Sequence, residues 1–336
     1  MSNQEPGQVK NNVLLTAYVI AGVLAVAGLG VLGVAIGSAS SSGHSTSMGS
    51  SSSSPAGPVA IDPVVVDTAG LPSGGVNPGI FTDTCQLTLT APNDPILMPG
   101  MTGKSMQHNF FGNLDPTSSS TPASLVGQST NCSTSADASA YWTPVLYQEG
   151  KALEPRSTLI YWRAPASSAA TVQSIPAGIT LIAGKEDATT PQDAHVIGWT
   201  CSGKLTGKLA SVPTDCPSGS YLRLVATFPN CWDGHSLDGS TQQNVVYATM
   251  SGCPASYPVQ IPQVVVHVNY PTASASGLTL SIGPTQQGSI LTGHADFMDG
   301  WDQATMSRNV TACIDTQTRC GAVTGAQATP RGGVQR

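Results

Sequence analysis

The sequence predicts an all-β domain, a jelly-roll-like or two-sheet β-sandwich with short helices, preceded by one N-terminal transmembrane helix. Charged residues make up only 10% of the chain, while 36 Gly and 25 Pro interrupt it often, which argues against a coiled coil or helical bundle. Long helical periodicity is absent, and short period-two runs bounded by turn residues recur, as in strands. These runs are Gln86–Thr90, Ser157–Trp162 in part, Tyr221–Val225, Val264–Val268 and Leu278–Ile282.

We expect one folded domain over residues 59–321, a size that all-β domains reach. Its best helix candidate runs from Trp301 to Asn309, with Asp299 placed to cap it. The tail, residues 322–336, is predicted to be disordered. Residues 37–58 are rich in Ser and lack apolar periodicity, so they are predicted to form a disordered stalk.

The N-terminal region predicts a membrane segment. Residues 13–36 carry no charge, and at about 1.5 Å per residue a helix of this length spans the roughly 30 Å hydrocarbon layer. The apolar core of a cleaved signal peptide is shorter, about 7–15 residues, so we expect an uncleaved signal anchor. Lys10 precedes the segment and no Lys or Arg follows it up to residue 58, which places residues 1–12 in the cytoplasm and the domain outside the cell. The small residues Gly37–Ser40 keep open the alternative of cleavage and secretion.

The cysteine content agrees with export. The eight cysteines all follow the apolar run, and an oxidising compartment would pair them. Zinc binding is the rival interpretation, but no C-x-x-C motif occurs. Eight cysteines allow 105 pairings, and loop length alone favours the pairing of neighbours. The neighbouring pairs are Cys85 with Cys132, Cys201 with Cys216, Cys231 with Cys253, and Cys313 with Cys320.

Five ordered strings carry a resemblance to a known family: Asp94–Gly100, His108–Asn113, Ser139–Tyr147, Phe228–Gly234 and His294–Asp302. Over residues 85–320 the chain resembles the family catalogued as domain of unknown function number nineteen ninety-six, whose members are mostly secreted fungal and bacterial proteins. The resemblance implies an exported domain with a link to extracellular polysaccharide. It does not imply a particular reaction.

The chain departs from the family at several histidines. Where members typically carry S-H-x-H, this sequence has Met106 in place of the first His. The family's D-H-x-S-H stretch reads Thr241–Val245 here, and its S-H-P-V string reads Ser256–Val259. Only His108 and His294 remain of that set. If the family's His cluster binds a metal or transfers protons, this chain has lost part of it.

His108, His294 and Asp296 are the strongest catalytic candidates. Imidazole titrates near neutral pH and acts as an acid, a base or a metal ligand. Two histidines with Asp94 or Asp296 suit a divalent ion, although no particular cofactor follows from the sequence. The alternative is that each His only holds a loop in place by a hydrogen bond.

Binding candidates are Asp94, Trp142, Trp301 and Asp302. Paired carboxylates can cleave glycosides when they lie about 5–10 Å apart. The alternative is that the acidic residues are structural, with Asp299 as a helix cap and Asp233 as a turn residue. An exposed Trp ring can stack on a sugar. Trp232 follows Cys231 directly and is expected in the core instead.

The sequence excludes several function classes. A net charge of −6 with only 13 Lys and Arg argues against nucleic-acid binding, and neither a nucleophile elbow nor a phosphate loop occurs. We expect a membrane-anchored extracellular domain that binds or processes cell-wall or extracellular polysaccharide. The alternatives are a non-catalytic surface or adhesion module and a secreted metal-binding protein. The sequence does not decide whether the chain is an enzyme, nor its oligomeric state.

Overall fold

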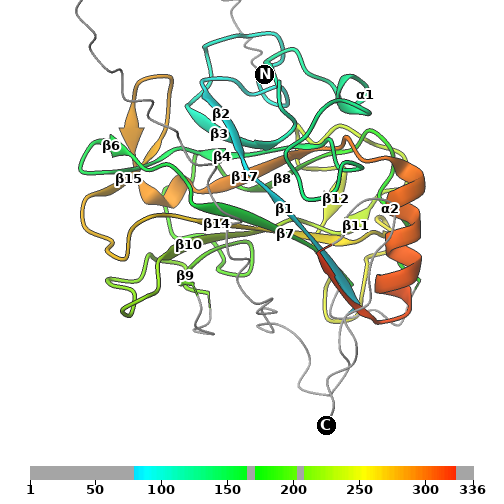
Figure 1. Cartoon of the computed structure of the whole chain (residues 1–336). Helices are drawn as coiled ribbons and strands as arrows, with labels where there is room; N and C mark the ends of the chain where they lie inside the picture. Colours follow the sequence, from blue (N-terminus) through cyan, green and yellow to red (C-terminus); the bar gives the residue numbers. More distant parts are fainter. Residues whose placement is uncertain (1–78, 165–170, 203–207, 323–336) are drawn as a thin grey trace, which may run out of the picture. The chain divides into compact units, whose positions relative to one another are not determined.

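Strands dominate the computed structural model, which describes residues 79–164, 171–202 and 208–322 (Figure 1). The chain divides into two units, Met1–Val59 and Ala60–Arg336, and every described residue belongs to the second unit. The predicted transmembrane helix, the stalk and nearly all of the tail lie outside the described residues. Within the described part of the chain, no helix has the length and apolar character needed to cross a membrane.

The larger of two main sheets has six strands in the order β18-β1-β7-β14-β10-β9. All neighbours are antiparallel except β1 and β18, which run parallel. Strong β-formers fill its central strands, since β14 contains three consecutive valines. The bounds are β1 Ile80–Cys85, β7 Ser157–Arg163, β9 Ile197–Cys201, β10 Leu222–Thr227, β14 Gln263–Asn269 and β18 Arg319–Ala322.

The second main sheet has five antiparallel strands in the order β2-β3-β4-β17-β8. Its strands come from distant parts of the chain, so the sheet brings together residues that are far apart in sequence. The bounds are β2 Leu87–Ala91, β3 His108–Gly112, β4 Ala140–Pro144, β8 Thr180–Gly184 and β17 His294–Met298.

Two smaller sheets and a few short helices complete the described structure. The small sheets run β16-β15-β5-β6 and β12-β11-β13. The strand bounds are β5 Leu146–Gln148, β6 Lys151–Ala152, β11 Cys231–Trp232, β12 Val245–Val246, β13 Val259–Gln260, β15 Leu278–Ser281 and β16 Gln287–Gly288. The helices are α1 Pro122–Leu125, η1 Ile290–Thr292, α2 Gln303–Asn309 and η2 Val310–Asp315. The all-β prediction is confirmed, and each of the five predicted period-two runs overlaps a strand.

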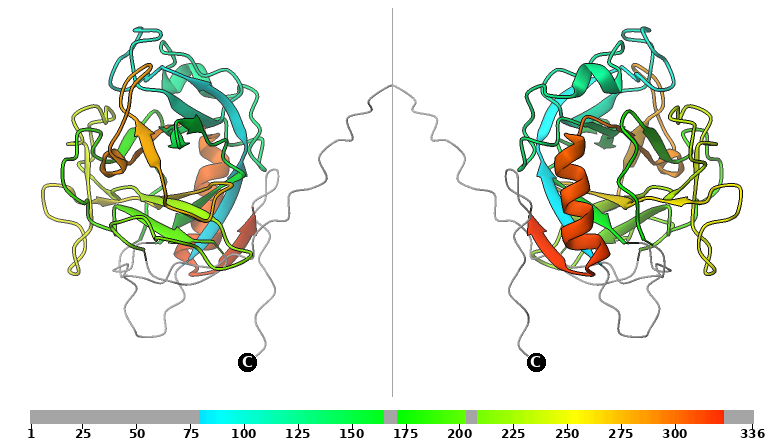
Figure 2. Two further views of the ribbon diagram at one scale, coloured as in Figure 1. Left: turned by 90° about the vertical axis from the view of Figure 1, so that its left-hand side faces the viewer. Right: turned by 90° about the vertical axis from the view of Figure 1, so that its right-hand side faces the viewer.

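The main hydrophobic core contains side chains from both large sheets. Trp162 of β7 meets Phe297 of β17 edge-to-face, with ring centroids 5.6 Å apart, and meets Trp301 at 5.8 Å. The six-stranded and five-stranded sheets lie as neighbouring layers in Figure 1, with α2 along one side (Figure 2). Because side chains alternate along a strand, His294 and Asp296 of β17 point to the opposite face from Phe297. We call that face, which is turned away from the main core, the outer face of the five-stranded sheet.

The helix near the C-terminus begins later than predicted. The sequence predicted a start at Trp301 with Asp299 as the cap, whereas α2 starts at Gln303 and Asp302 is its N-cap, with a carboxylate that accepts from the Thr305 amide at 2.8 Å. Trp301 forms a bridge with Asp137, so its backbone is extended and the helix cannot include it. Asp299 instead accepts from the Gly178 amide at 2.9 Å and the Trp301 amide at 3.1 Å.

Four disulfide bonds cross-link the domain, and the predicted pairing of neighbours is confirmed. Each bond constrains the unfolded chain and stabilises the fold by roughly 2–4 kcal/mol. Trp232, predicted in the core, is half-buried and packs against it. The pairs are Cys85–Cys132, Cys201–Cys216, Cys231–Cys253 and Cys313–Cys320.

Replacing Trp162 tests the shared core. We expect Trp162→Ala to lower the free energy of unfolding by about 3–5 kcal/mol, because it leaves a cavity where the two sheets meet. Urea unfolding followed by circular dichroism, with the disulfides intact, measures this. The matched control is Met250→Ala at a fully exposed side chain, which should change stability by less than about 0.5 kcal/mol. Equal effects of the two variants would contradict a core centred on Trp162.

Candidate functional site

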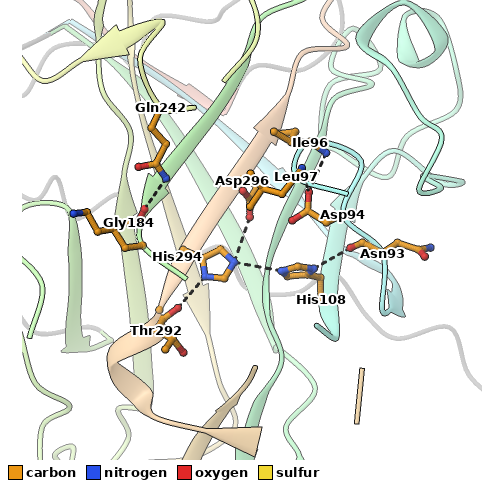
Figure 3. Close-up of polar contacts among 12 residues, drawn as sticks. Asn93, Asp94, Ile96, Leu97, His108, Gly184, Gln242, Thr292, His294 and Asp296 are labelled. Atoms are coloured by element: carbon orange, nitrogen blue, oxygen red, sulfur yellow. Dashed lines mark hydrogen bonds and ion pairs between the residues drawn. The ribbon is translucent and has the colours of Figure 1, made fainter. Parts of the chain in front are cut away.

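The outer face of the five-stranded sheet brings His108, His294 and Asp296 together (Figure 3). His108 begins β3 opposite Pro144 of β4, and Asp296 of β17 stands opposite Trp142 of the same strand, so the side chains share one face. The Nε2 atoms of the two histidines lie 3.3 Å apart, and His294 Nε2 lies 3.7 Å from Asp296 Oδ2. All three side chains are at most 1% exposed.

Backbone carbonyls determine which ring nitrogen of each histidine carries the proton. His108 Nδ1 lies 2.9 Å from the carbonyl oxygen of Asn93, and His294 Nδ1 lies 2.8 Å from that of Thr292. A carbonyl oxygen can only accept a hydrogen bond, so each Nδ1 is the donor. In the neutral imidazole, Nε2 is then left with a bare lone pair.

Both histidines are neutral at physiological pH. Burial lowers the pKa of His108 to about 4, against the raising effect of the Asn93 carbonyl. Burial also lowers the pKa of His294 to about 4, and the neighbouring His108 lowers it further. Two bare lone pairs therefore face each other at 3.3 Å with no proton between them. This arrangement is unfavourable unless a cation lies between the nitrogens.

Buried carboxylates surround the two histidines. Neither oxygen of Asp296 accepts a hydrogen bond, and burial raises its pKa well above the ordinary value, helped by the charges of Asp94 and Glu186. Asp94 accepts the amides of Ile96 and Leu97 through Oδ1, each at 2.9 Å, whereas its Oδ2 accepts none. Burial also raises the pKa of Asp94. Buried carboxylate oxygens without a hydrogen-bond partner are costly, and a cation beside them would stabilise them.

The donor set fits a divalent transition ion. One donor atom from each of His108, His294 and Asp296 lies within 4.8 Å of the others. A tetrahedral ion with bonds of about 2.0 Å holds neighbouring ligand atoms about 3.3 Å apart, which is the separation of the two Nε2 atoms. Metal-binding histidines usually donate their other N–H to a carbonyl or carboxylate, as both do here. Two imidazoles and a carboxylate suit Zn²⁺ or Fe²⁺.

Local backbone structure holds the site closed. The loop Asn93–Leu97 carries the carbonyl acceptor of His108 and the Asp94 carboxylate, and its Ile96 packs with Phe110 on the outer face. On the other side, Gly184 of β8 stands opposite His294 and has a φ of +86°. A Cβ atom there would lie 2.6 Å from Ile197 Cγ1, so only glycine allows β8 to end where it does.

The remaining predicted site residues take other places. Trp142 and Trp301 are fully buried, so neither ring offers a face to a sugar. Trp142 packs against Phe110 on the same face as the site, with ring centroids 5.3 Å apart, while Trp301 belongs to the main core. Asp302 is exposed but uses its carboxylate as the N-cap of α2. Asp233 is a turn residue as predicted, since it accepts the amides that follow it.

Sequence reasoning missed three contributors to the site. Glu186 follows β8, and its pKa is raised by burial and by the charges of Asp94 and Asp187. Its neighbours Lys185 and Asp187 make the segment look like an ordinary solvated loop in sequence. Asn93 and Thr292 act through backbone carbonyls, which no side-chain pattern reveals.

A second acidic group lies beside the Cys85–Cys132 disulfide. Asp83 and Asp137 have donor atoms within 4.8 Å of each other and of both sulfurs, but disulfide sulfurs are not thiolate ligands. Asp137 accepts the Tyr141 hydroxyl at 2.8 Å, and burial raises its pKa to about 6. Burial and the charge of Asp137 raise the pKa of Asp83. We interpret this pair as structural.

The pair makes stability depend on pH. Because the pKa of Asp137 is raised from 3.8 in the unfolded chain to about 6, its contribution to stability is full below pH 3.8 and is lost as the pH rises through 6. We expect Asp137→Asn to gain stability relative to the wild type as the pH rises from about 4 through 6. Urea unfolding of both proteins at several pH values measures the difference. A difference that does not change across this range would contradict the raised pKa.

Comparison with known proteins identifies one family. The family model described as Domain of unknown function (DUF1996) matches residues 94–301, a span that begins at Asp94 and contains His108, His294 and Asp296. The resemblance predicted from the sequence strings is confirmed. No curated protein and no solved structure matches the chain. The match covers more than half of the chain, which therefore belongs to the DUF1996 family.

Proposed function

We propose that this chain is a metal-binding domain in which His108, His294 and Asp296 hold a divalent transition ion. The observation that carries the proposal is the pair of bare Nε2 atoms, 3.3 Å apart, with each Nδ1 donated to a backbone carbonyl. The bound ion replaces the missing positive partner of Asp296, and the nearby Asp94 adds negative charge. Zn²⁺ fits the nitrogen separation best.

Metal binding explains the site better than proton transfer between side chains does. A general acid or base needs access to the reacting group, but His108 and His294 are closed off beneath the Asn93–Leu97 loop and are neutral. A metal ligand needs a neutral imidazole with a bare nitrogen, which both histidines supply. The same features that weaken an acid–base role therefore support a ligand role.

We also propose that the domain lies outside the cell, anchored by residues 13–36 or secreted after cleavage, and binds or processes cell-wall or extracellular polysaccharide. Four disulfide bonds support an oxidising compartment. The shared core of the two main sheets supports a sandwich or jelly-roll architecture. In this proposal His108, His294 and Asp296 would hold the ion, which would supply Lewis-acid chemistry toward a sugar oxygen.

A second candidate is a non-catalytic surface module in which the ion is structural. Complete burial of His108, His294 and Asp296 favours it, because structural metal sites are closed whereas catalytic sites keep an open position. The two candidates share the metal site and differ in whether removal of the ion abolishes a reaction or only lowers stability.

Metal analysis tests the site directly. We expect the purified full chain, stripped with chelator and reloaded with Zn²⁺, to hold about one ion and to melt at a higher temperature than the stripped protein. His108→Ala and His294→Ala each remove a ligand and should weaken zinc binding by at least about 100-fold. The control, His235→Ala, removes a histidine that is 78% exposed and should bind like the wild type. A wild-type chain that is folded yet neither retains zinc nor gains thermal stability from it contradicts the proposal.

Reducing-sugar release from insoluble glucans distinguishes the two candidates. If the ion is catalytic, zinc-loaded wild-type protein releases sugar, and His294→Ala and the stripped protein lose at least about 100-fold of the rate. His235→Ala serves again as the control. Loss of thermal stability without any turnover by the loaded wild type would leave the non-catalytic module as the function.

A further inference from the structure

A cavity of about 600 Å³ lies at the end of β8, beside the proposed metal site. One wall comes from the segment between Ile182 and Val196, and the other comes from Pro229, Gln242 and Val245–Tyr247. The volume falls within the usual range for small-molecule sites, about 300–1,000 Å³. None of the three metal-ligand candidates lines this cavity.

The cavity and the metal site share one strand end. Ile182 and Gly184 line the cavity, and the same residues stand opposite Asp296 and His294 in the sheet. Beyond the strand, Lys185 and Asp187 also line the cavity. The strand end that lines the cavity is therefore paired with the strand that carries His294 and Asp296, which makes the two sites adjacent.

Hydrogen bonds hold the cavity wall to the segment directly before the strand that carries His294. The side-chain amide of Gln192 donates to the carbonyl oxygens of Leu291 at 2.8 Å and Gly293 at 2.7 Å, and its oxygen accepts the Lys185 amide at 2.9 Å. Gln242 on the opposite wall donates to the Gly184 carbonyl at 2.9 Å. The cavity is thus a pre-formed feature tied to β8 and β17.

The lining suits a neutral, hydroxyl-rich ligand. Its polar side chains include the hydroxyls of Thr189 and Thr190, while its charged side chains are one cation, Lys185, and two carboxylates, Asp187 and Asp193. This balance disfavours phosphates and other anions, which need an excess of positive charge. The rest of the lining includes apolar side chains, so the cavity matches a sugar, which has polar edges and an apolar face.

Tyr247 supplies a stacking platform in this cavity. Its hydroxyl donates to the Thr227 carbonyl at 2.8 Å, which anchors one end of the side chain, yet the residue is 37% exposed. Tyr247 also lines the cavity, and the hydrogen bond of its hydroxyl restricts the orientation of the side chain. A fixed aromatic face is what a sugar ring packs against.

We infer that this cavity is a saccharide-binding subsite for a neutral oligosaccharide, with Tyr247 as its stacking residue. The inference rests on the proposed function, because it names the substrate class for the adjacent metal site. It adds a binding surface that lies outside the metal site.

Titration calorimetry of the full chain with neutral hexasaccharides tests the inference. The probes are the hexaoses of β-1,3-glucan, β-1,4-glucan, α-1,4-glucan and chitin. We expect at least one to bind, Tyr247→Ala to weaken that binding by about tenfold or more, and Tyr247→Phe to retain it because the ring remains. The matched control is Tyr257→Ala. The Tyr257 hydroxyl also donates to a backbone carbonyl, that of Gln243, at 2.9 Å, but Tyr257 does not line the cavity.

Repeating the titration with stripped and zinc-loaded protein separates this inference from the proposed function. Saccharide binding without zinc uptake would refute the metal site and keep the subsite. Zinc uptake with no binding of any hexaose, or with equal binding by folded wild type and Tyr247→Ala, would overturn the subsite and keep the metal site. Preferential binding of a peptide or an anionic sugar at Tyr247 would also overturn it.

Discussion

The position of β17 between β4 and β8 is the constraint on which the rest of the structure depends. One face of this strand sends Phe297 into the core against Trp162, and the other face presents His294 and Asp296. Since strand side chains alternate strictly, a shift of one residue in register would exchange the two faces. It would bury a carboxylate among the tryptophans and remove the metal-ligand candidates. Core packing and site geometry are therefore enforced by the same strand pairing.

Backbone groups, rather than further side chains, orient the two histidines. The Asn93 carbonyl belongs to the loop that also supplies Asp94, and the Thr292 carbonyl belongs to η1, directly before β17. Every residue has a backbone carbonyl, so any side chain that fits sterically can stand at these two positions. The orienting contacts therefore tolerate sequence change. The chain keeps the donor set of His108, His294 and Asp296 although it carries Met106 where family members typically have a histidine.

Features encoded by nearby residues could be predicted, and features that depend on distant contacts could not. Strand alternation located the five runs, and short loops favoured the disulfide pairing. The start of α2 was misplaced because Trp301 forms a bridge with Asp137, a residue far away in the sequence. Local sequence patterns cannot reveal such a contact. His108 and His294 were candidates in sequence, but only the order β3-β4-β17 brings their Nε2 atoms to 3.3 Å from each other. Glu186 carried no pattern at all, and residue type alone could not tell that Trp142 is buried.

The edge strand β8 separates the rigid five-stranded sheet from the cavity that lies beyond its free edge. Among the described residues, no further strand pairs with that edge. Side chains bind its carbonyl groups instead: Asn244 donates to the Thr180 carbonyl at 3.0 Å, and Gln242 donates to the Gly184 carbonyl. Polar side chains on an edge satisfy its carbonyls while blocking the addition of another strand. They also leave space beyond the edge, where the cavity forms. The metal-ligand candidates thus stand on paired strands, which hold them precisely, while the cavity walls are mainly loop segments, where ligand-contacting residues can vary without disturbing the sheet.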